Sequence, residues 1–85
     1  MNQQTAGWRI RAVNEHILFI AGFGDWSTET AQAFCSESRE ITETLLSDPW
    51  AFLCDATDWV FTDPGVQKLL KEQIAWNIGK GCRVG

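Results

Sequence analysis

The sequence predicts an α/β fold with the element order β-β-α-β-α-β. Three observations point to this class. A stretch near the N-terminus alternates apolar and polar residues, two compact apolar runs at Ile17–Ala21 and Trp50–Cys54 are too short for helices, and two longer segments repeat apolar residues at helical spacing. With 85 residues, the chain has room for one domain, residues 1–85, around a single core.

The first two strands are predicted to form an antiparallel hairpin. From Trp8 onward the alternation puts Trp8 and Ile10 on one face and the two arginines at positions 9 and 11 on the other. Residues 14–16 (Asn-Glu-His) are typical of a tight reversal. The following run, residues 17–21, is apolar on both faces, so we expect it to be a central strand.

The first helix is expected to begin after Ser27 as N-cap and to end near Leu46, because Ser47-Asp48-Pro49 follows and proline disfavours helix in the residue before it. The expected buried face of this helix consists of Ala31, Phe34, Cys35, Ile41 and Leu45, with Leu46 beside it.

The third strand is predicted at Trp50–Cys54 and a loop at Asp55–Phe61. Asp63 is the expected N-cap of the second helix, with Pro64 at its first position and Thr62 as the competing cap. This helix should run to about Ile78. Its expected buried stripe is Val66, Leu69, Leu70, Ile74 and Ile78. Residues 82–85 are expected to begin a fourth strand.

The expected sheet is mixed and four-stranded, with both helices on one face, because right-handed crossovers place them there when strands two to four are parallel neighbours. The opposite face would expose apolar side chains from the central strands. Either a second subunit or a final strand and helix that this domain lacks must cover it, and we expect a homo-oligomer. Trp8, Ile10 and Trp76 are the candidate contacts between subunits, Trp76 because it lies off the buried stripe of its helix.

Composition argues against several classes of function. The net charge is −4, and from Asp25 to Asp63 there are nine acids and one base, so no basic stripe is available for nucleic acid. No apolar run approaches the ~20 residues of a membrane span, and the N-terminus lacks the apolar region of a signal peptide. The three cysteines are odd in number and far apart, which favours reduced thiols in the cytoplasm.

Acids and aromatic residues gather where strands two and three are expected to end. Asp25 follows one strand, and Asp55, Asp58 and Asp63 follow the other, so their carboxylates are expected at one edge of the sheet, where Mg²⁺ and phosphate could bind. The alternative is that these acids only end strands and cap a helix. Trp26 and Trp59 are expected on the loops beside them, as binding residues or as part of the core. No zinc pattern or phosphate loop is present, so we expect no cofactor.

The order of elements resembles the STAS domain, the fold of anti-sigma-factor antagonists and sulfate-transporter tails. Residues 52–55 (Phe-Leu-Cys-Asp) match the strand and first acid of that family, and residues 61–63 (Phe-Thr-Asp) match the approach to its second helix. Pro64 falls where the family has its phosphorylated serine, and proline has no hydroxyl. Thr62 is a candidate substitute acceptor, although a role as helix cap explains it better.

The resemblance, which is closest to bacterial STAS-like proteins, therefore implies a non-catalytic, regulatory or protein-interaction module without the phospho-switch. We expect it to act as a homo-oligomer, with a regulatory protein as partner.

Overall fold

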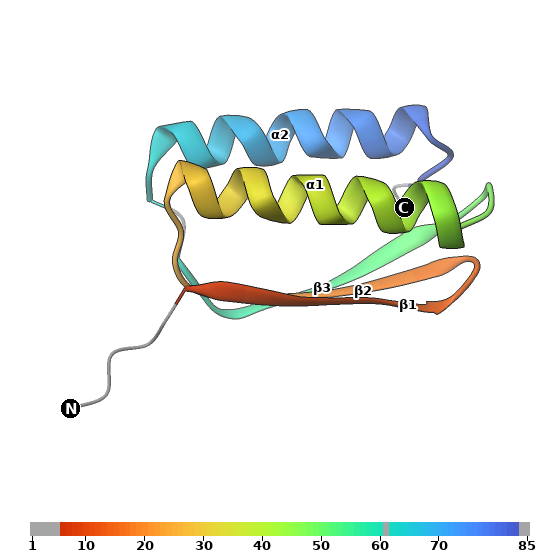
Figure 1. Cartoon of the computed structure of the whole chain (residues 1–85), viewed down its shortest axis with the longest axis horizontal. Helices are drawn as coiled ribbons and strands as arrows, with labels where there is room; N and C mark the ends of the chain where they lie inside the picture. Colours follow the sequence, from red (N-terminus) through yellow and green to blue (C-terminus); the bar gives the residue numbers. More distant parts are fainter. Residues whose placement is uncertain (1–5, 61, 84–85) are drawn as a thin grey trace.

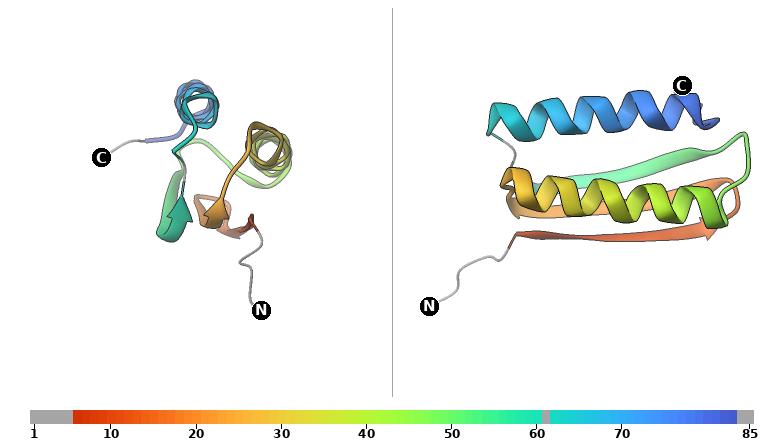
Figure 2. Two further views of the ribbon diagram at one scale, coloured as in Figure 1. Left: turned by 90° about the vertical axis from the view of Figure 1, so that its left-hand side faces the viewer. Right: turned by 45° about the horizontal axis from the view of Figure 1, so that its top comes forward.

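Two helices lie side by side over one face of a three-stranded sheet in the computed structural model of the chain (Figure 1). The structure describes residues 6–60 and 62–83. The end-on view in Figure 2 places both helices on the same side of the sheet and leaves the other side open. The predicted α/β class and the one-sided helix layer are thereby confirmed.

The N-terminal hairpin forms as predicted. β1 (Gly7–Asn14) and β2 (Ile17–Asp25) are antiparallel, with Ile10 opposite Ile20. At the turn, the backbone N–H of His16 donates a hydrogen bond to the side-chain oxygen of Asn14 over 2.8 Å. A short polar side chain that satisfies a backbone donor two residues on is the physical reason for the reversal at this point.

The third strand is longer than predicted. β3 (Ala51–Val60) runs parallel to β2, which is therefore the central strand. The prediction that residues 55–61 form a loop is wrong, because the pairing continues after a bulge between Asp55 and Asp58 and brings Trp59 opposite Gly24. Such a bulge absorbs extra residues without ending the strand. Phe61 lies outside the described residues.

A fourth strand does not form within the described residues. Cys82 makes one isolated parallel bridge to Trp50. The backbone N–H of Trp50 donates a hydrogen bond to the carbonyl of Gly81 over 3.1 Å. The backbone N–H of Arg83 donates to the carbonyl of Trp50 over 2.8 Å. Val84 and Gly85 lie outside the described residues. Within the part of the chain that the structure describes, the sheet therefore ends at β3.

Both helices begin at the predicted caps. α1 (Thr28–Leu45) starts after Ser27, whose hydroxyl accepts a hydrogen bond from the N–H of Thr30 over 3.2 Å. α2 (Pro64–Gly79) starts after Asp63, whose carboxylate accepts from the N–H of Gly65 over 2.7 Å. Asp63 is thus the cap in preference to its neighbour at position 62, and proline occupies the first helical position, where its missing N–H costs no hydrogen bond.

The inward face of α1 agrees with the prediction except at its end. Leu45 is exposed, whereas Leu46, the C-cap residue, packs against the core. The buried residues of this helix are Ala31, Phe34, Cys35, Ser38 and Thr42.

α2 is rotated relative to the prediction. Its buried residues are Val66, Gln73 and Asn77, whereas Ile74 and Ile78 are 43% and 52% exposed. The predicted burial of these two isoleucines is therefore wrong. The reason is that α2 packs on α1 through its polar Gln73–Asn77 row, in which Gln73 accepts a hydrogen bond from Arg39, so both isoleucines lie on a part of α2 that α1 does not cover.

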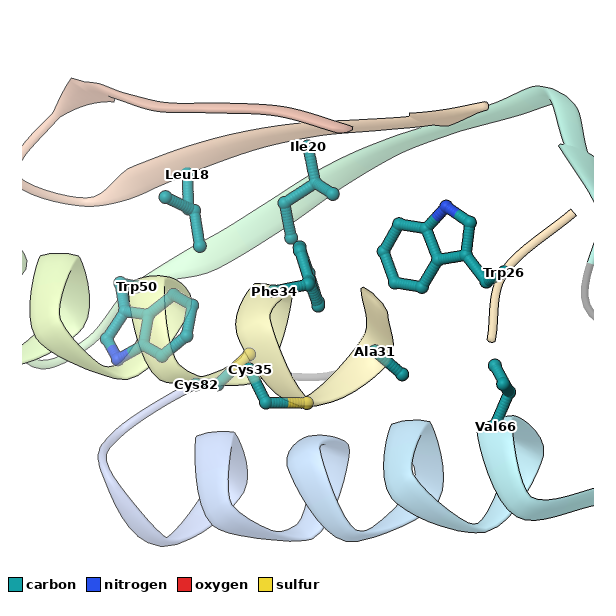
Figure 3. Packing of buried hydrophobic residues seen from close by; sticks show 9 residues of the cluster. All are labelled: Leu18, Ile20, Trp26, Ala31, Phe34, Cys35, Trp50, Val66 and Cys82. Atoms are coloured by element: carbon teal, nitrogen blue, oxygen red, sulfur yellow. The ribbon is translucent and has the colours of Figure 1, made fainter. Parts of the chain in front are cut away.

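The hydrophobic core lies between the helices and the sheet (Figure 3). Trp26 and Trp50 are large aromatic residues at its two ends, and Phe34 of α1 lies between the helix and β2. The buried cluster consists of Leu18, Ile20, Trp26, Ala31, Phe34, Cys35, Trp50, Val66 and Cys82. Because all of these side chains lie on the helix side, the other face of the sheet has no covering layer among residues 6–60 and 62–83.

Candidate functional site

The uncovered side of the sheet has an apolar centre between opposite charges. β2 turns Leu18 and Ile20 into the core, so the alternating residues of this strand point to the other side, where they are half-buried. A hollow of about 430 Å³ on this side is lined by residues of all three strands. We call this surface the open face. It comprises Arg9, Arg11, Phe19, Ala21, Phe23, Leu53, Asp55 and Asp58.

The charges of the open face are arranged by strand. Arg9 lies on β1 opposite Ala21 of β2, and Ala21 lies opposite Asp55 of β3, so these three residues form one row across the sheet. The next row consists of Arg11, Phe19 and Leu53. Leu53, which is 60% exposed, occupies the β3 position that Asp55 holds in the first row. Within the described residues neither Arg9 nor Asp55 has an ion-pair partner, so both charges are available to a partner.

Asp55 and Asp58 belong to β3 rather than to a loop. Both are exposed, and Asp55 accepts hydrogen bonds from the hydroxyl and the N–H of Thr57 over 2.7 and 3.1 Å. The bond from the hydroxyl, and to a lesser extent the bond from the backbone N–H, stabilise the ionised carboxylate. They therefore hold the pKa of Asp55 below its ordinary value. Asp55 therefore keeps its charge through the neutral and mildly acidic range.

The other acids have separate positions. Asp25 is the exposed last residue of β2, Asp63 caps α2, and Thr62 is exposed beside that cap. Among the described residues, no group of three or more histidine, cysteine or acidic side chains is placed to hold a metal ion. The four carboxylates that the sequence predicted at one edge of the sheet therefore do not form such a group within the described residues.

Trp26 and Trp59 are in the interior. Trp26 is 1% exposed, and its indole N–H donates to the carbonyls of Gly7 and Phe23 over 3.1 and 3.2 Å. Trp59 is half-buried, and its ring centroid lies 4.5 Å from that of Trp26. Trp26 thus lies on the segment between β2 and α1, as predicted, and of the two roles that the sequence left open its side chain has the one in the core.

The three candidate subunit contacts also lie on the helix side. Trp8 and Ile10 pack partly buried against the core, and the indole N–H of Trp8 donates to Glu37 of α1 over 2.6 Å. Trp76 is half-buried on α2, with the guanidinium carbon of Arg39 5.1 Å from its ring centroid. None of the three belongs to the open face, because the alternation along β1 points Trp8 and Ile10 toward α1.

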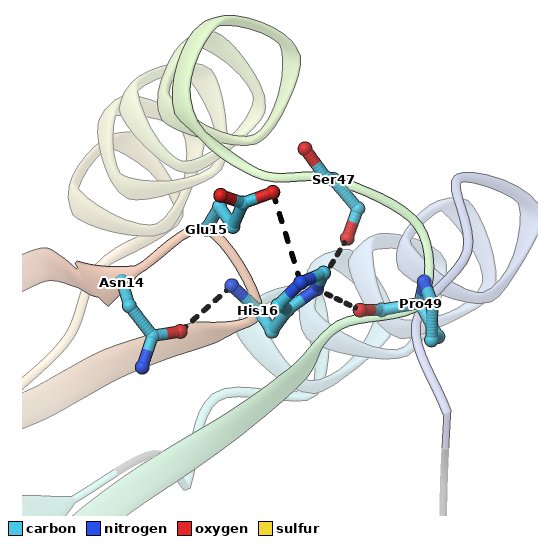
Figure 4. A network of polar contacts seen from close by, with 5 residues as sticks. All are labelled: Asn14, Glu15, His16, Ser47 and Pro49. Atoms are coloured by element: carbon cyan, nitrogen blue, oxygen red, sulfur yellow. Dashed lines mark hydrogen bonds and ion pairs between the residues drawn. The ribbon is translucent and has the colours of Figure 1, made fainter.

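His16 connects the β1–β2 turn to the segment between α1 and β3 (Figure 4). Its Nδ1 lies 2.7 Å from the carbonyl oxygen of Pro49 and 3.3 Å from that of Ser47. The β1–β2 turn is thereby tied to the segment that leads into β3. Because its ring contacts the backbone carbonyls of two residues in another loop, His16 has a structural role here.

The three thiols are protonated at neutral pH. Cys35 and Cys82 are buried and Cys54 lies on the exposed edge strand, all as free cysteines. Burial raises the pKa of the Cys35 and Cys82 thiols, and partial desolvation followed by the neighbouring carboxylate of Asp55 raises that of Cys54. Because the thiolate is the nucleophile, none of the three has the character of an activated cysteine.

Sequence reasoning predicted an uncovered sheet face with apolar side chains and named Asp55 and Asp58 as candidate binding residues, but it did not join them to the two arginines of β1. It placed Arg9 and Arg11 on one side of β1 but gave that side no function. The signal that could have found the face was the same alternation, read together with Phe19 and Phe23 on β2. Only the pairing register shows that Asp55 completes a row with Arg9.

A scan against protein-family models, a search of curated proteins and a search of solved structures each found no match to this chain. Of the helices within residues 6–60 and 62–83, none has the length and apolar character that crossing a membrane requires.

Proposed function

We propose that the chain is a non-catalytic protein-interaction module that associates with a second copy of itself through the open face. The observation that carries the proposal is the row Arg9–Ala21–Asp55, which puts opposite charges on the two strands that flank the central strand. A surface of this kind is complementary to its own copy.

The geometry of the dimer follows from this row. A two-fold axis parallel to β2 stacks two open faces and lays β1 of one protomer over β3 of the other. Arg9 then faces Asp55 of the partner subunit, and the same pair forms a second time by symmetry. Stacked sheets lie about 10 Å apart, a distance that these side chains span together. The apolar centre around Phe19 and Phe23 is covered in the same step.

The energetics favour association. Leu53 and the half-buried phenylalanines of β2 lose contact with water, and apolar burial contributes roughly 25 cal/mol per Å². The charge pairs contribute more to specificity and orientation than to affinity, because each ion loses hydration when it pairs. They would select the aligned two-fold arrangement over other ways of stacking the sheets.

The regulatory part of the proposal rests on the STAS resemblance. The observed order β-β-α-β-α, the parallel β2–β3 pair and the cap at Asp63 support it. The bridge between Cys82 and Trp50 lies where a fourth parallel strand of that fold would begin beside β3. We place the module in the cytoplasm, where its cysteines stay reduced, and we propose that a regulatory protein is its further partner.

Charge reversal tests the proposed dimer. The mass of the wild-type chain, measured by light scattering and sedimentation equilibrium, is expected to be that of a dimer. Arg9→Glu and Asp55→Lys each create two repulsive pairs, which should raise the dissociation constant roughly hundredfold. An equimolar mixture of the two variants should form heterodimers, because each repulsive contact then becomes attractive. Glu40→Lys, an exposed site on α1, is the matched control and should leave the mass unchanged.

Two results would overturn the proposal. A wild-type chain that stays monomeric at high micromolar concentration would reject self-association. A dimer whose mass does not respond to either reversal, with no heterodimer on mixing, would reject the open face as the interface.

A further inference from the structure

A second surface feature lies on the other side of the sheet, between α1, α2 and β3. It is a cavity of about 370 Å³, within the size range of pockets for small organic ligands. The wall is mostly apolar. It is formed chiefly by Ile20, Phe34, Phe52, Trp59, Leu70 and Ile74.

The cavity exists because of two local features. On β3 the residues that line it shrink from Phe52 to Cys54 and Ala56, so the strand leaves space beneath α2. The rotation of α2 toward α1 aims Leu70 and Ile74 into this space without filling it, and Ile74 remains 43% exposed. The result is an apolar pocket that opens beside the outer edge of β3.

One buried polar atom in the wall has no partner. Ser38, in the middle of α1, is 0% exposed, and its hydroxyl oxygen makes no hydrogen bond. In the same helix Thr42 donates to the carbonyl of Ser38 over 2.8 Å, and Thr44 donates to that of Glu40 over 2.8 Å. Ser38 lacks the corresponding bond to its own helix. A buried hydroxyl without a partner is costly, so this group is suited to a ligand that brings one.

Two other buried polar side chains of the wall, Gln73 and Asn77, are already paired. Gln73 donates to the side-chain oxygen of Asn77 over 2.9 Å and accepts from Nε of Arg39 over 2.9 Å. Lys71 lines the cavity from an exposed position on α2. Ser38 therefore offers a ligand in the interior a hydroxyl that makes no hydrogen bond within the described residues.

We propose that this cavity binds a small amphiphile with an apolar body and one neutral hydrogen-bonding head, such as an alcohol or carbonyl group, which pairs with the hydroxyl of Ser38. A neutral head is required because an ionised one would lose its hydration at a point where Ser38 offers a single uncharged partner. The apolar body lies against Phe52, Leu70 and Ile74. This binding goes beyond the proposed dimer and uses the opposite side of the sheet.

The test uses 1-octanol as the probe and the full chain, with binding followed by isothermal titration calorimetry and by the fluorescence of Trp59 in the cavity wall. The wild type should bind with saturation at one site per chain. Ser38→Ala should weaken binding about tenfold, the effect expected from the loss of one hydrogen bond. Ser36→Ala, an exposed serine of the same helix, is the matched control and should bind as the wild type does. Octanoate, with its ionised head, should bind more weakly than 1-octanol.

Two further variants test where 1-octanol binds and whether its binding is independent of the dimer. Ala56→Phe fills the cavity and should abolish binding while far-ultraviolet circular dichroism shows the fold intact. Arg9→Glu should dissociate the dimer without changing the affinity for 1-octanol, so failure of one proposal does not imply failure of the other.

The proposal is overturned if the wild type shows no saturable binding, if folded Ala56→Phe binds as well as the wild type, or if Ser38→Ala binds equally tightly. A second readout comes from the chain without ligand. Removing an unpaired buried hydroxyl should raise the urea midpoint of Ser38→Ala, and a lowered midpoint would show that the hydroxyl has a structural partner.

Discussion

Gly22 is the position where the structure makes its sharpest prediction about stability. This residue is buried in β2 under the ring of Trp59. A Cβ atom added there would lie 2.3 Å from Cδ2 and 2.6 Å from Cε3 of the indole. Real Cβ atoms do not approach ring carbons so closely, so Gly22→Ala must move either the strand or the tryptophan.

The cost can be worked from these contacts. Forcing a methyl group into a packed site costs about 1–3 kcal/mol. Displacing Trp59 also disturbs its contact with Trp26, whose ring centroid is 4.5 Å away, at about 0.5–1.5 kcal/mol for an aromatic pair. We expect Gly22→Ala to lose about 2–4 kcal/mol. Since a small domain has only about 5–15 kcal/mol in total, this is a large fraction of its stability.

Urea unfolding followed by tryptophan fluorescence measures this loss, and near-ultraviolet circular dichroism reports the Trp26–Trp59 contact. Gly79→Ala is the matched control, because a Cβ at Gly79 meets no atom within 4 Å and the residue ends α2. It should gain about 0.4–1 kcal/mol by restricting the unfolded chain. A Gly22→Ala variant within about 0.5 kcal/mol of the wild type, with an unchanged near-ultraviolet spectrum, would refute the packing described here.

Three further predictions concern local contacts and pH. His16→Ala removes the contacts with the carbonyls of Ser47 and Pro49 and should cost about 1–2 kcal/mol in urea unfolding, and an unchanged midpoint would contradict the role of this side chain. Asp63→Ala removes the N-cap of α2 and should lower the stability measured by thermal unfolding by about 0.5–2 kcal/mol. Asp63→Asn should keep most of that stability, because asparagine also caps helices. Equal losses in the two variants would argue against the capping role. Burial raises the pKa of Cys35 and Cys82, so the folded state holds these protons more tightly than the unfolded state does. The contribution of these two thiols to the free energy of unfolding should therefore be complete below the ordinary thiol pKa of about 8.5 and should decrease as the pH rises above it. A pH series of urea midpoints measures this decline, and replacing both cysteines by alanine should make it less steep.

Much of the fold could be predicted from short stretches of sequence. The alternation from Trp8, the turn at Asn14 and the apolar run of β2 identified the hairpin, and Ser27 and Asp63 marked the starts of both helices. Each of these features depends on contacts within a few residues, such as a cap oxygen that accepts from the first turn. Local chemistry of this kind is present in the sequence itself.

The tertiary structure decided which face of α2 is buried and how far β3 extends. Whether α2 buries Ile74 or Gln73 depends on its neighbour, and α1 offers it a polar contact through Arg39, while the outer side of β3 has no strand within the described residues. The extent of β3 likewise depends on β2, since pairing with Gly24 keeps Trp59 in the strand after the bulge.

The candidate sites depend on long-range placement in the same way. Arg9 and Asp55 are 46 positions apart and become one row only through the register of two strand pairs. Nothing in the sequence distinguishes Ser38 from the other serines. Its hydroxyl makes no hydrogen bond because it lies at the wall of the cavity. The sequence by itself determined the elements and their caps, because these arise from neighbours in the chain. Only the tertiary structure decided which faces are covered, because that depends on residues brought together from distant segments.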